Sequence, residues 1–131
     1  MSLQTNGLHH LAIRVTDLAR ARTFYVDTLG FLFVVDLPGG IIVNANGLLL
    51  GIRGDAPETV RGDRFVPFRV GLDHIALTVG DAGALVTLQK QLDRNDVRNN
   101  GIEDDPVLGA KYISFYDPDG IAWELYAPIA R

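Results

Sequence analysis

The sequence predicts an α+β fold made of two tandem modules, each with the element order βαβββ. The first observation is an internal repeat, in which residues 7–17 align with residues 71–81 at a constant offset of 64 and six of the eleven positions are identical. The second is that a similar succession of strand-like, helix-like and strand-like patterns follows each copy. The third is size, because a half of about 60 residues buries little core by itself. We therefore expect the two halves to pair their sheets around one core.

Residues 7–53 form the first predicted module. Its opening strand alternates apolar and polar side chains, and Asp17 is placed to cap the helix that follows. Apolar residues recur at helical spacing up to Leu29, and Gly30 is a typical helix-ending residue. Three extended runs follow, separated by turns rich in proline, glycine and asparagine; they cover residues 31–36, 41–44 and 48–53.

Residues 54–70 are predicted to be a linker, and residues 71–128 the second module. In this half Asp81 takes the capping position, and leucines recur at helical spacing behind it. The extended runs lie near Val97, over 111–115 and over 121–127, and the last two are divided by the turn Asp-Pro-Asp-Gly at 117–120. Together the two modules are expected to form a single domain over residues 7–128.

Composition excludes several classes of function. The net charge is −4 and the basic residues form no run, so nucleic-acid binding has little support. The chain has no cysteine, which excludes disulfides, thiolate metal sites and a thiol nucleophile. No apolar stretch approaches the roughly 18–20 residues of a membrane span, and no signal-peptide pattern is present. We expect a cytoplasmic protein that binds neither nucleic acid nor membrane.

Three polar side chains are predicted to share the concave face of the sheets. Strand alternation places His10 and His74 on the face with small and polar residues, and places Glu124 on the matching face of the last strand. A carboxylate buried without a partner is costly, so Glu124 requires a cation or strong donors.

Two imidazoles and one carboxylate make a 2-His-1-carboxylate set, which leaves metal positions open for substrate or dioxygen. The sequence leaves an alternative open, in which Arg14 or Arg53 pairs with Glu124 and the histidines only fill space.

Four motifs along the chain are shared with a known group of proteins. They are Leu-His-His-Leu-Ala-Ile-Arg-Val around His10, Phe24-Tyr25 before Leu29-Gly30-Phe31, Asp-His-Ile-Ala-Leu-Thr-Val around His74, and the 117–120 turn followed by Glu124. With them the chain resembles the vicinal oxygen chelate superfamily over residues 7–128. This superfamily includes glyoxalase I, extradiol dioxygenases, fosfomycin-resistance enzymes and bleomycin-resistance proteins.

The resemblance implies a curled mixed sheet, or half-barrel, around a central metal cleft. It also implies that His10, His74 and Glu124 hold a divalent metal ion, and imidazole with carboxylate suits Fe, Mn, Ni, Co and Zn alike. A homodimer is expected, since short chains of this superfamily usually pair and the edges of small sheets need cover.

The chain departs from individual members of the superfamily at particular positions. By the repeat, Gly51 stands where glyoxalase I has a fourth protein ligand. Ser114 stands at the tyrosine position of the extradiol enzymes, and Ala12 at a threonine position of the fosfomycin enzymes. The resemblance therefore implies a dioxygenase-like, three-ligand site rather than a four-ligand lactoylglutathione lyase.

The functional hypothesis is a metal-dependent enzyme, a dioxygenase or a lyase or isomerase, acting on a small substrate with vicinal oxygens. Tyr112, Ser114 and Tyr126 are the candidate catalytic hydroxyls, and Arg14 and Arg53 are candidate anchors for a substrate carboxylate. The alternative is a bleomycin-resistance-like binding protein that sequesters a small molecule without catalysis.

Overall fold

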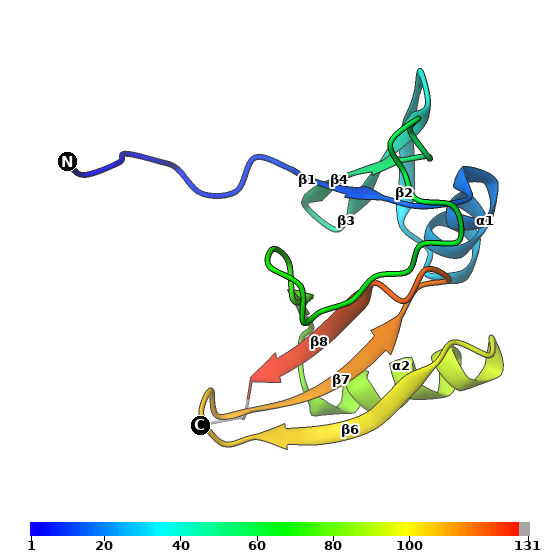
Figure 1. The fold of residues 1–131 in the computed structure, drawn as a ribbon. Coiled ribbons are helices and arrows are strands. Elements are labelled where there is room, and N and C mark those ends of the chain that lie inside the picture. Colours follow the sequence, from blue (N-terminus) through cyan, green and yellow to red (C-terminus); the bar gives the residue numbers. More distant parts are fainter. Residues whose placement is uncertain (129–131) are drawn as a thin grey trace. The chain divides into compact units, whose positions relative to one another are not determined.

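The chain divides into two compact units, Met1–Asp63 and a second that begins at Arg64. The structure is a computed structural model and describes residues 1–128 (Figure 1). The division falls inside the segment 54–70 that the sequence predicts to be a linker. Each unit contains its own four-stranded mixed sheet, and neither sheet is a closed barrel.

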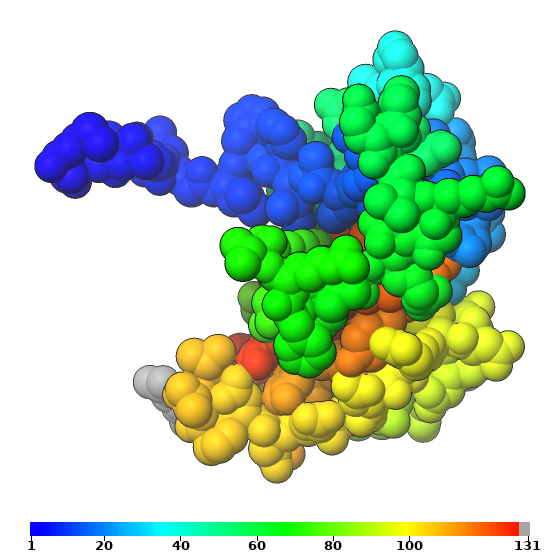
Figure 2. Space-filling view, viewed as in Figure 1, coloured from blue at the N-terminus to red at the C-terminus, as the bar shows by residue number. Residues whose placement is uncertain are grey.

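The first unit holds β1 (Leu11–Arg14), α1 (Leu18–Arg22), the π-helical turn η1 (Thr23–Thr28), β2 (Leu32–Leu37), β3 (Gly40–Ala45) and β4 (Leu48–Arg53). Its strand order is β1-β4-β3-β2, with β1 parallel to β4 and the other pairs antiparallel. Asp17 caps α1, since its side chain accepts a hydrogen bond from the backbone N–H of Arg20. The N-terminal residues project from this unit and are exposed (Figure 2).

The helix of the first unit differs from the prediction in its second half. The helical spacing predicts one α-helix up to Leu29, but the helix widens at Thr23, and the N–H of Leu29 bonds the carbonyl of Phe24, five residues back. The wider turn buries two consecutive aromatic side chains, Phe24 and Tyr25, whose rings meet edge to face at 5.0 Å.

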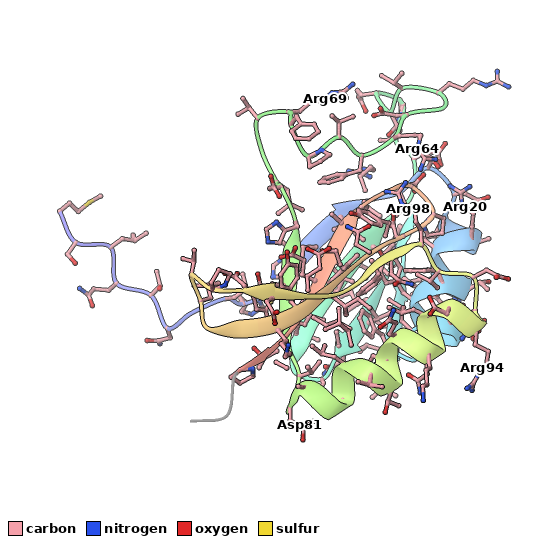
Figure 3. The ribbon with its side chains drawn as sticks, turned by 90° about the horizontal axis from the view of Figure 1, so that it is seen from below. Arg20, Arg64, Arg69, Asp81, Arg94 and Arg98 are labelled. Carbon is pink, nitrogen blue, oxygen red and sulfur yellow. The ribbon has the colours of Figure 1, made fainter. Side chains whose placement is uncertain are left out.

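The second unit holds β5 (Ile75–Thr78), α2 (Ala82–Arg94), β6 (Asn99–Asp105), β7 (Ala110–Tyr116) and β8 (Ala122–Pro128). Its strand order is β5-β8-β7-β6, with β5 parallel to β8, which repeats the topology of the first unit. The predicted fold class of tandem βαβββ modules is therefore confirmed. Asp81 begins α2 as its cap and Arg94 lies in its last turn, where a cation suits the helix dipole (Figure 3).

Alternation along the strands of the second unit separates an apolar face from a polar face. Ile113, Phe115 and Trp123 are buried on one face, and α2 packs on this sheet through Leu85 and Leu92. Ser114 and Glu124 pair across β7 and β8 on the opposite face. No helix within residues 1–128 is long and apolar enough to cross a membrane.

Candidate metal-binding site

His74 and Glu124, two of the predicted ligands, are in contact within the second unit. Parallel pairing of β5 with β8 sets Ala76 opposite Glu124, and His74 directly precedes β5. His74 Nε2 lies 2.8 Å from Glu124 Oε1. The side chain of Glu124 is 16% exposed and that of His74 is 40% exposed. The carboxylate is therefore mostly buried, whereas the imidazole is partly accessible to solvent.

Two further side chains complete a chain of contacts around this pair. The Ser114 hydroxyl donates to Glu124 Oε2 at 3.0 Å, from the facing position on β7. Asp73 Oδ1 lies 2.7 Å from His74 Nδ1. Within the second unit, the carboxylate of Glu124 therefore has partners in His74 and Ser114.

The His74–Glu124 pair fits a divalent metal ion. Metal–nitrogen and metal–oxygen bonds are about 2.0–2.2 Å long, so two ligand atoms at right angles on one ion lie about 3.0 Å apart. The 2.8 Å separation of Nε2 and Oε1 is close to this value. The carboxylate of Asp73 on the other ring nitrogen is the arrangement common behind metal-bound histidines. Imidazole and carboxylate donors together suit Mn, Fe, Co, Ni and Zn.

His10, the third predicted ligand, belongs to the first unit. It directly precedes β1, as His74 precedes β5, and it is exposed. Its Nδ1 lies 2.8 Å from Nδ1 of His9, and the two rings are nearly perpendicular. Within either unit, the described residues contain no group of three His, Cys, Asp or Glu side chains that could hold a metal ion. The three-ligand set thus stays a prediction.

Gly51 occupies the position in the first unit that Glu124 occupies in the second. Gly51 pairs with Ala12 in the parallel β1–β4 ladder, just as Glu124 pairs with Ala76 in the β5–β8 ladder. A Cβ atom at Gly51 would lie 3.6 Å from the Cβ of Ala12, which is an ordinary van der Waals contact. The backbone therefore does not require glycine there, and the position simply offers no ligand atom.

Tyr112 and Tyr126 pair across β7 and β8, and their rings stack with centroids 4.9 Å apart. Their hydroxyls point to acids of β6, with Tyr112 donating to Glu103 at 3.0 Å and Tyr126 to Asp105 at 2.7 Å. The hydrogen bond to Glu103 raises the pKa of Tyr112, and burial followed by the bond to Asp105 raises the pKa of Tyr126. Both hydroxyls are therefore donors at neutral pH.

Of the three predicted hydroxyls, Ser114 contacts Glu124, whereas the other two are engaged by Glu103 and Asp105. Negative charge on Glu124 also raises the pKa of Tyr112 and Tyr126, which places both rings within its electrostatic reach.

Arg14 and Arg53, the predicted anchors, face each other in register across β1 and β4. Arg14 donates from Nη1 to the carbonyl of Gly54 at 2.9 Å. Like charges in directly opposite positions are unfavourable, so an anion bound between them would relieve their repulsion. In the same unit, a pocket of about 470 Å³ is lined by Thr16 and by residues of the segment 55–62, which lie two residues or more beyond Arg14 and Arg53 in the sequence.

Asp73 and His9 contact predicted ligands but were not themselves predicted to be site residues. Both stand directly before a predicted ligand, and both contact the Nδ1 atom of that ligand. Their position one residue before each histidine of the repeat is the signal that could have identified them.

Comparison with known proteins agrees with the fold and with the motifs. The profile of the Glyoxalase/Bleomycin resistance protein/Dioxygenase superfamily matches residues 7–125. The chain belongs to this superfamily, and the predicted relationship is confirmed. Two relatives are uncharacterized proteins: YaeR of Escherichia coli (strain K12), 32% identical, and YwkD of Bacillus subtilis (strain 168), 29% identical. The alignments cover 91% and 92% of this chain and 94% and 95% of the relatives.

Solved structures show the same fold. SMU.1112c superposes with a TM-score of 0.79 at 27% identity, over 94% of this chain and 99% of that chain. A mutant of the fosfomycin resistance protein FosX from Listeria monocytogenes, complexed with Mn(II) and 1S,2S-dihydroxypropylphosphonic acid, gives 0.74 at 19%, over 95% and 92%. Lactoylglutathione lyase from Agrobacterium tumefaciens gives 0.74 at 22%, over 94% of both chains.

Proposed function

We propose that the protein is a divalent-metal-dependent enzyme that binds a small substrate through two vicinal oxygens, with His10, His74 and Glu124 as the metal ligands. The contact between His74 and Glu124 carries this proposal, because it brings together an imidazole nitrogen and a carboxylate oxygen, two donors of the chemistry that a divalent ion takes. When bound, the metal ion supplies Lewis-acid stabilisation of negative charge on substrate oxygens. Fe, Mn, Ni, Co and Zn all suit this donor set.

The remaining residues of the site bind and orient. Ser114 holds one oxygen of Glu124 so that the other faces His74. The stacked rings of Tyr112 and Tyr126 form an aromatic wall for a bound substrate, and their hydroxyls are hydrogen-bond donors. Arg14 and Arg53 bind a carboxylate or another anionic group of the substrate. The absence of a ligand atom at Gly51 favours dioxygenase-like chemistry over a four-ligand lyase.

Binding without catalysis is the second candidate function. It is favoured by the two tyrosine hydroxyls, which are bonded to Glu103 and Asp105 rather than directed at Glu124, and by the flat stacked surface that their rings offer to an aromatic compound. In this case the protein would sequester a small molecule, as bleomycin-resistance proteins do.

The setting that we propose is a cytoplasmic homodimer. The lack of cysteine is consistent with a reducing compartment. The edge strand β2 carries exposed apolar side chains, Leu32, Val34 and Val35, which pairing with a second copy would cover.

Metal content is the first test. The purified wild type and the variants His10→Ala, His74→Ala and Glu124→Ala are compared with Glu58→Ala, an exposed acid outside the site. We expect near-stoichiometric metal in the wild type and in Glu58→Ala, and strongly reduced metal in the other three. A metal at 100 times its Kd raises the free energy of unfolding by about 2.7 kcal/mol, which thermal melts detect. Equal metal content in all five proteins would refute the site.

The same proteins then separate the two functions. After anaerobic loading with Fe(II), oxygen uptake is measured with catechols and other enolisable compounds. Uptake that requires Glu124 supports an oxygenase. Tight binding of these compounds without any turnover, in every metal form, supports the binding protein.

A further inference from the structure

The same local contact occurs at both histidines of the repeat. In the second unit Asp73 contacts Nδ1 of His74, and in the first unit His9 contacts Nδ1 of His10, at 2.7 and 2.8 Å. Residues 9 and 73 are equivalent positions at the offset of 64, yet one is an imidazole and the other a carboxylate. The contact is thus a property of the fold, and only its chemistry differs between the modules.

We propose that Asp73 and His9 are positioning residues that contact Nδ1 of His74 and His10 and so leave Nε2 of each as the ligand atom. This inference rests on the proposed function, because it assigns a role to these side chains within the same metal site. It adds that the two histidines differ in strength, with His74 the stronger ligand.

Asp73 holds a proton on Nδ1 of His74. An ionised carboxylate can only accept hydrogen bonds, so Nδ1 of His74 must donate to Oδ1 of Asp73. Nε2, 2.8 Å from Glu124 Oε1, is then the ring atom that would bind a metal ion, which would take the place of the direct contact between the imidazole and this carboxylate. A carboxylate partner also makes the imidazole a better electron donor, and loss of such a partner typically costs 10–100-fold in metal affinity.

His9 does the same for His10 by a weaker contact. Of the two facing Nδ1 atoms, one must donate and the other accept, so His10 exposes an unprotonated Nε2 only when its own Nδ1 donates to His9. A contact between neutral rings is weaker than one to a carboxylate. The carboxylate partner and the carboxylate ligand Glu124 therefore both belong to the second unit, which makes His74 the principal anchor.

If Asp73 had a purely structural role, its truncation would change the stability of the protein through lost packing. The Asp73 side chain is 73% exposed, so its truncation removes little packing. Asp104 is a matched control, because its side chain is also 73% exposed and has one cationic partner, Lys111. Any effect specific to Asp73 then reflects its contact with His74.

The experiment measures Zn(II) and Mn(II) affinity by calorimetry for the wild type, Asp73→Ala, Asp73→Asn, His9→Asp and Asp104→Ala. We expect a 10–100-fold loss in Asp73→Ala, a smaller loss in Asp73→Asn because its amide oxygen still accepts, tighter binding in His9→Asp, and no change in Asp104→Ala. Melting temperatures of the metal-free proteins should stay together.

Nitrogen NMR supplies a readout that does not depend on metal. The ¹⁵N shift of His74 Nδ1 distinguishes a protonated from an unprotonated nitrogen, and we expect the protonated value in wild type, with or without Zn(II). In Asp73→Ala the shift should move toward that of a ring exchanging between tautomers. Should Asp73→Ala match Asp104→Ala in both affinity and shift, the positioning role is wrong. A wild type that binds no metal refutes the proposed function instead, and the shift in metal-free protein still decides the role of Asp73.

Discussion

Glu124 illustrates how single side chains set the chemistry of this site. Its strand is otherwise apolar, and the carboxylate is tolerated because each oxygen has a partner, His74 on one side and Ser114 on the other. Ser114 is only 8% exposed, so its hydroxyl cannot be replaced by bulk water without rearrangement. The orientation of Glu124 therefore depends on a residue outside the proposed ligand set.

The Ser114→Ala variant tests this dependence. It leaves one oxygen of a mostly buried carboxylate without its donor, and we expect the free energy of unfolding to fall by about 1–3 kcal/mol. Urea unfolding of metal-free protein measures the change. Ser114→Thr keeps the hydroxyl and should retain most of the stability. If Ser114→Ala is as stable as the wild type, Glu124 is not held by this hydrogen bond.

At the scale of elements, the alternation of residues in strands and the internal repeat predict the strands and their faces better than they predict contacts between side chains. The four strands of each unit, their polar and apolar faces and the equivalence of Gly51 with Glu124 follow from alternation and from the turn glycines. The widened helical turn at Thr23 could not be predicted, because it depends on packing Phe24 and Tyr25 together.

The contacts of Asp73 and of the tyrosine hydroxyls could not be predicted from the sequence either. Asp73 lies before β5 begins, so strand alternation does not fix the direction of its side chain. Tyr112 reaches Glu103 because the two residues are directly paired in the antiparallel β6–β7 ladder, whereas the sequence indicated only an extended run near Val97 for this strand and no register.

The hydrogen bond from Tyr126 of β8 to Asp105 of β6 predicts that the stability of the protein depends on pH. Asp105 accepts a hydrogen bond from the Tyr126 hydroxyl, and further bonds from the backbone N–H groups of Leu108 and Val107, which together lower its pKa below 3.8. A carboxyl with a lowered pKa in the folded state stabilises the protein above pH 3.8, and this contribution is lost as the pH falls through the folded-state pKa.

We therefore expect Asp105→Asn to lose less stability than the wild type on acidification through this range. The free energy of unfolding, measured in urea from about pH 6 to about pH 2, gives the comparison. Asp104→Asn is the control, because Asp104 is the neighbouring acid and pairs with Lys111 instead of with Tyr126. Since this variant keeps Asp105, it should lose stability on acidification through this range as the wild type does. An identical acid slope in Asp105→Asn and wild type would contradict the assigned hydrogen bonds.

At the scale of the whole molecule, the two units share a topology but not a chemistry. In the proposed site, the second unit would supply the carboxylate ligand Glu124, its partner Ser114 and the carboxylate next to His74, whereas the first unit has His10 and, at the position equivalent to Glu124, a glycine. The two units thus have similar backbones, and the proposed function assigns most of the polar groups of the metal site to the second.

Gly51→Glu tests whether the first unit can be converted. The new side chain meets only ordinary contacts at its Cβ, so the protein should fold. If position 51 faces the metal site as Glu124 does, the added carboxylate should tighten metal binding about tenfold, equivalent to about 1.4 kcal/mol, and should suppress any oxygen uptake with Fe(II) by filling an open position. Gly51→Leu adds comparable bulk without a ligand atom and should show no tightening. Equal affinity in the two variants would exclude position 51 from the site.

The roomy, unstrained backbone at Gly51 has an evolutionary consequence. The glycine codons GGA and GGG become glutamate codons by a change at a single base, and the geometry at this position demands no compensating substitution at the Cβ atom. For the proposed three-ligand site, one mutational step would therefore add a fourth protein ligand without a substitution elsewhere in the β1–β4 ladder.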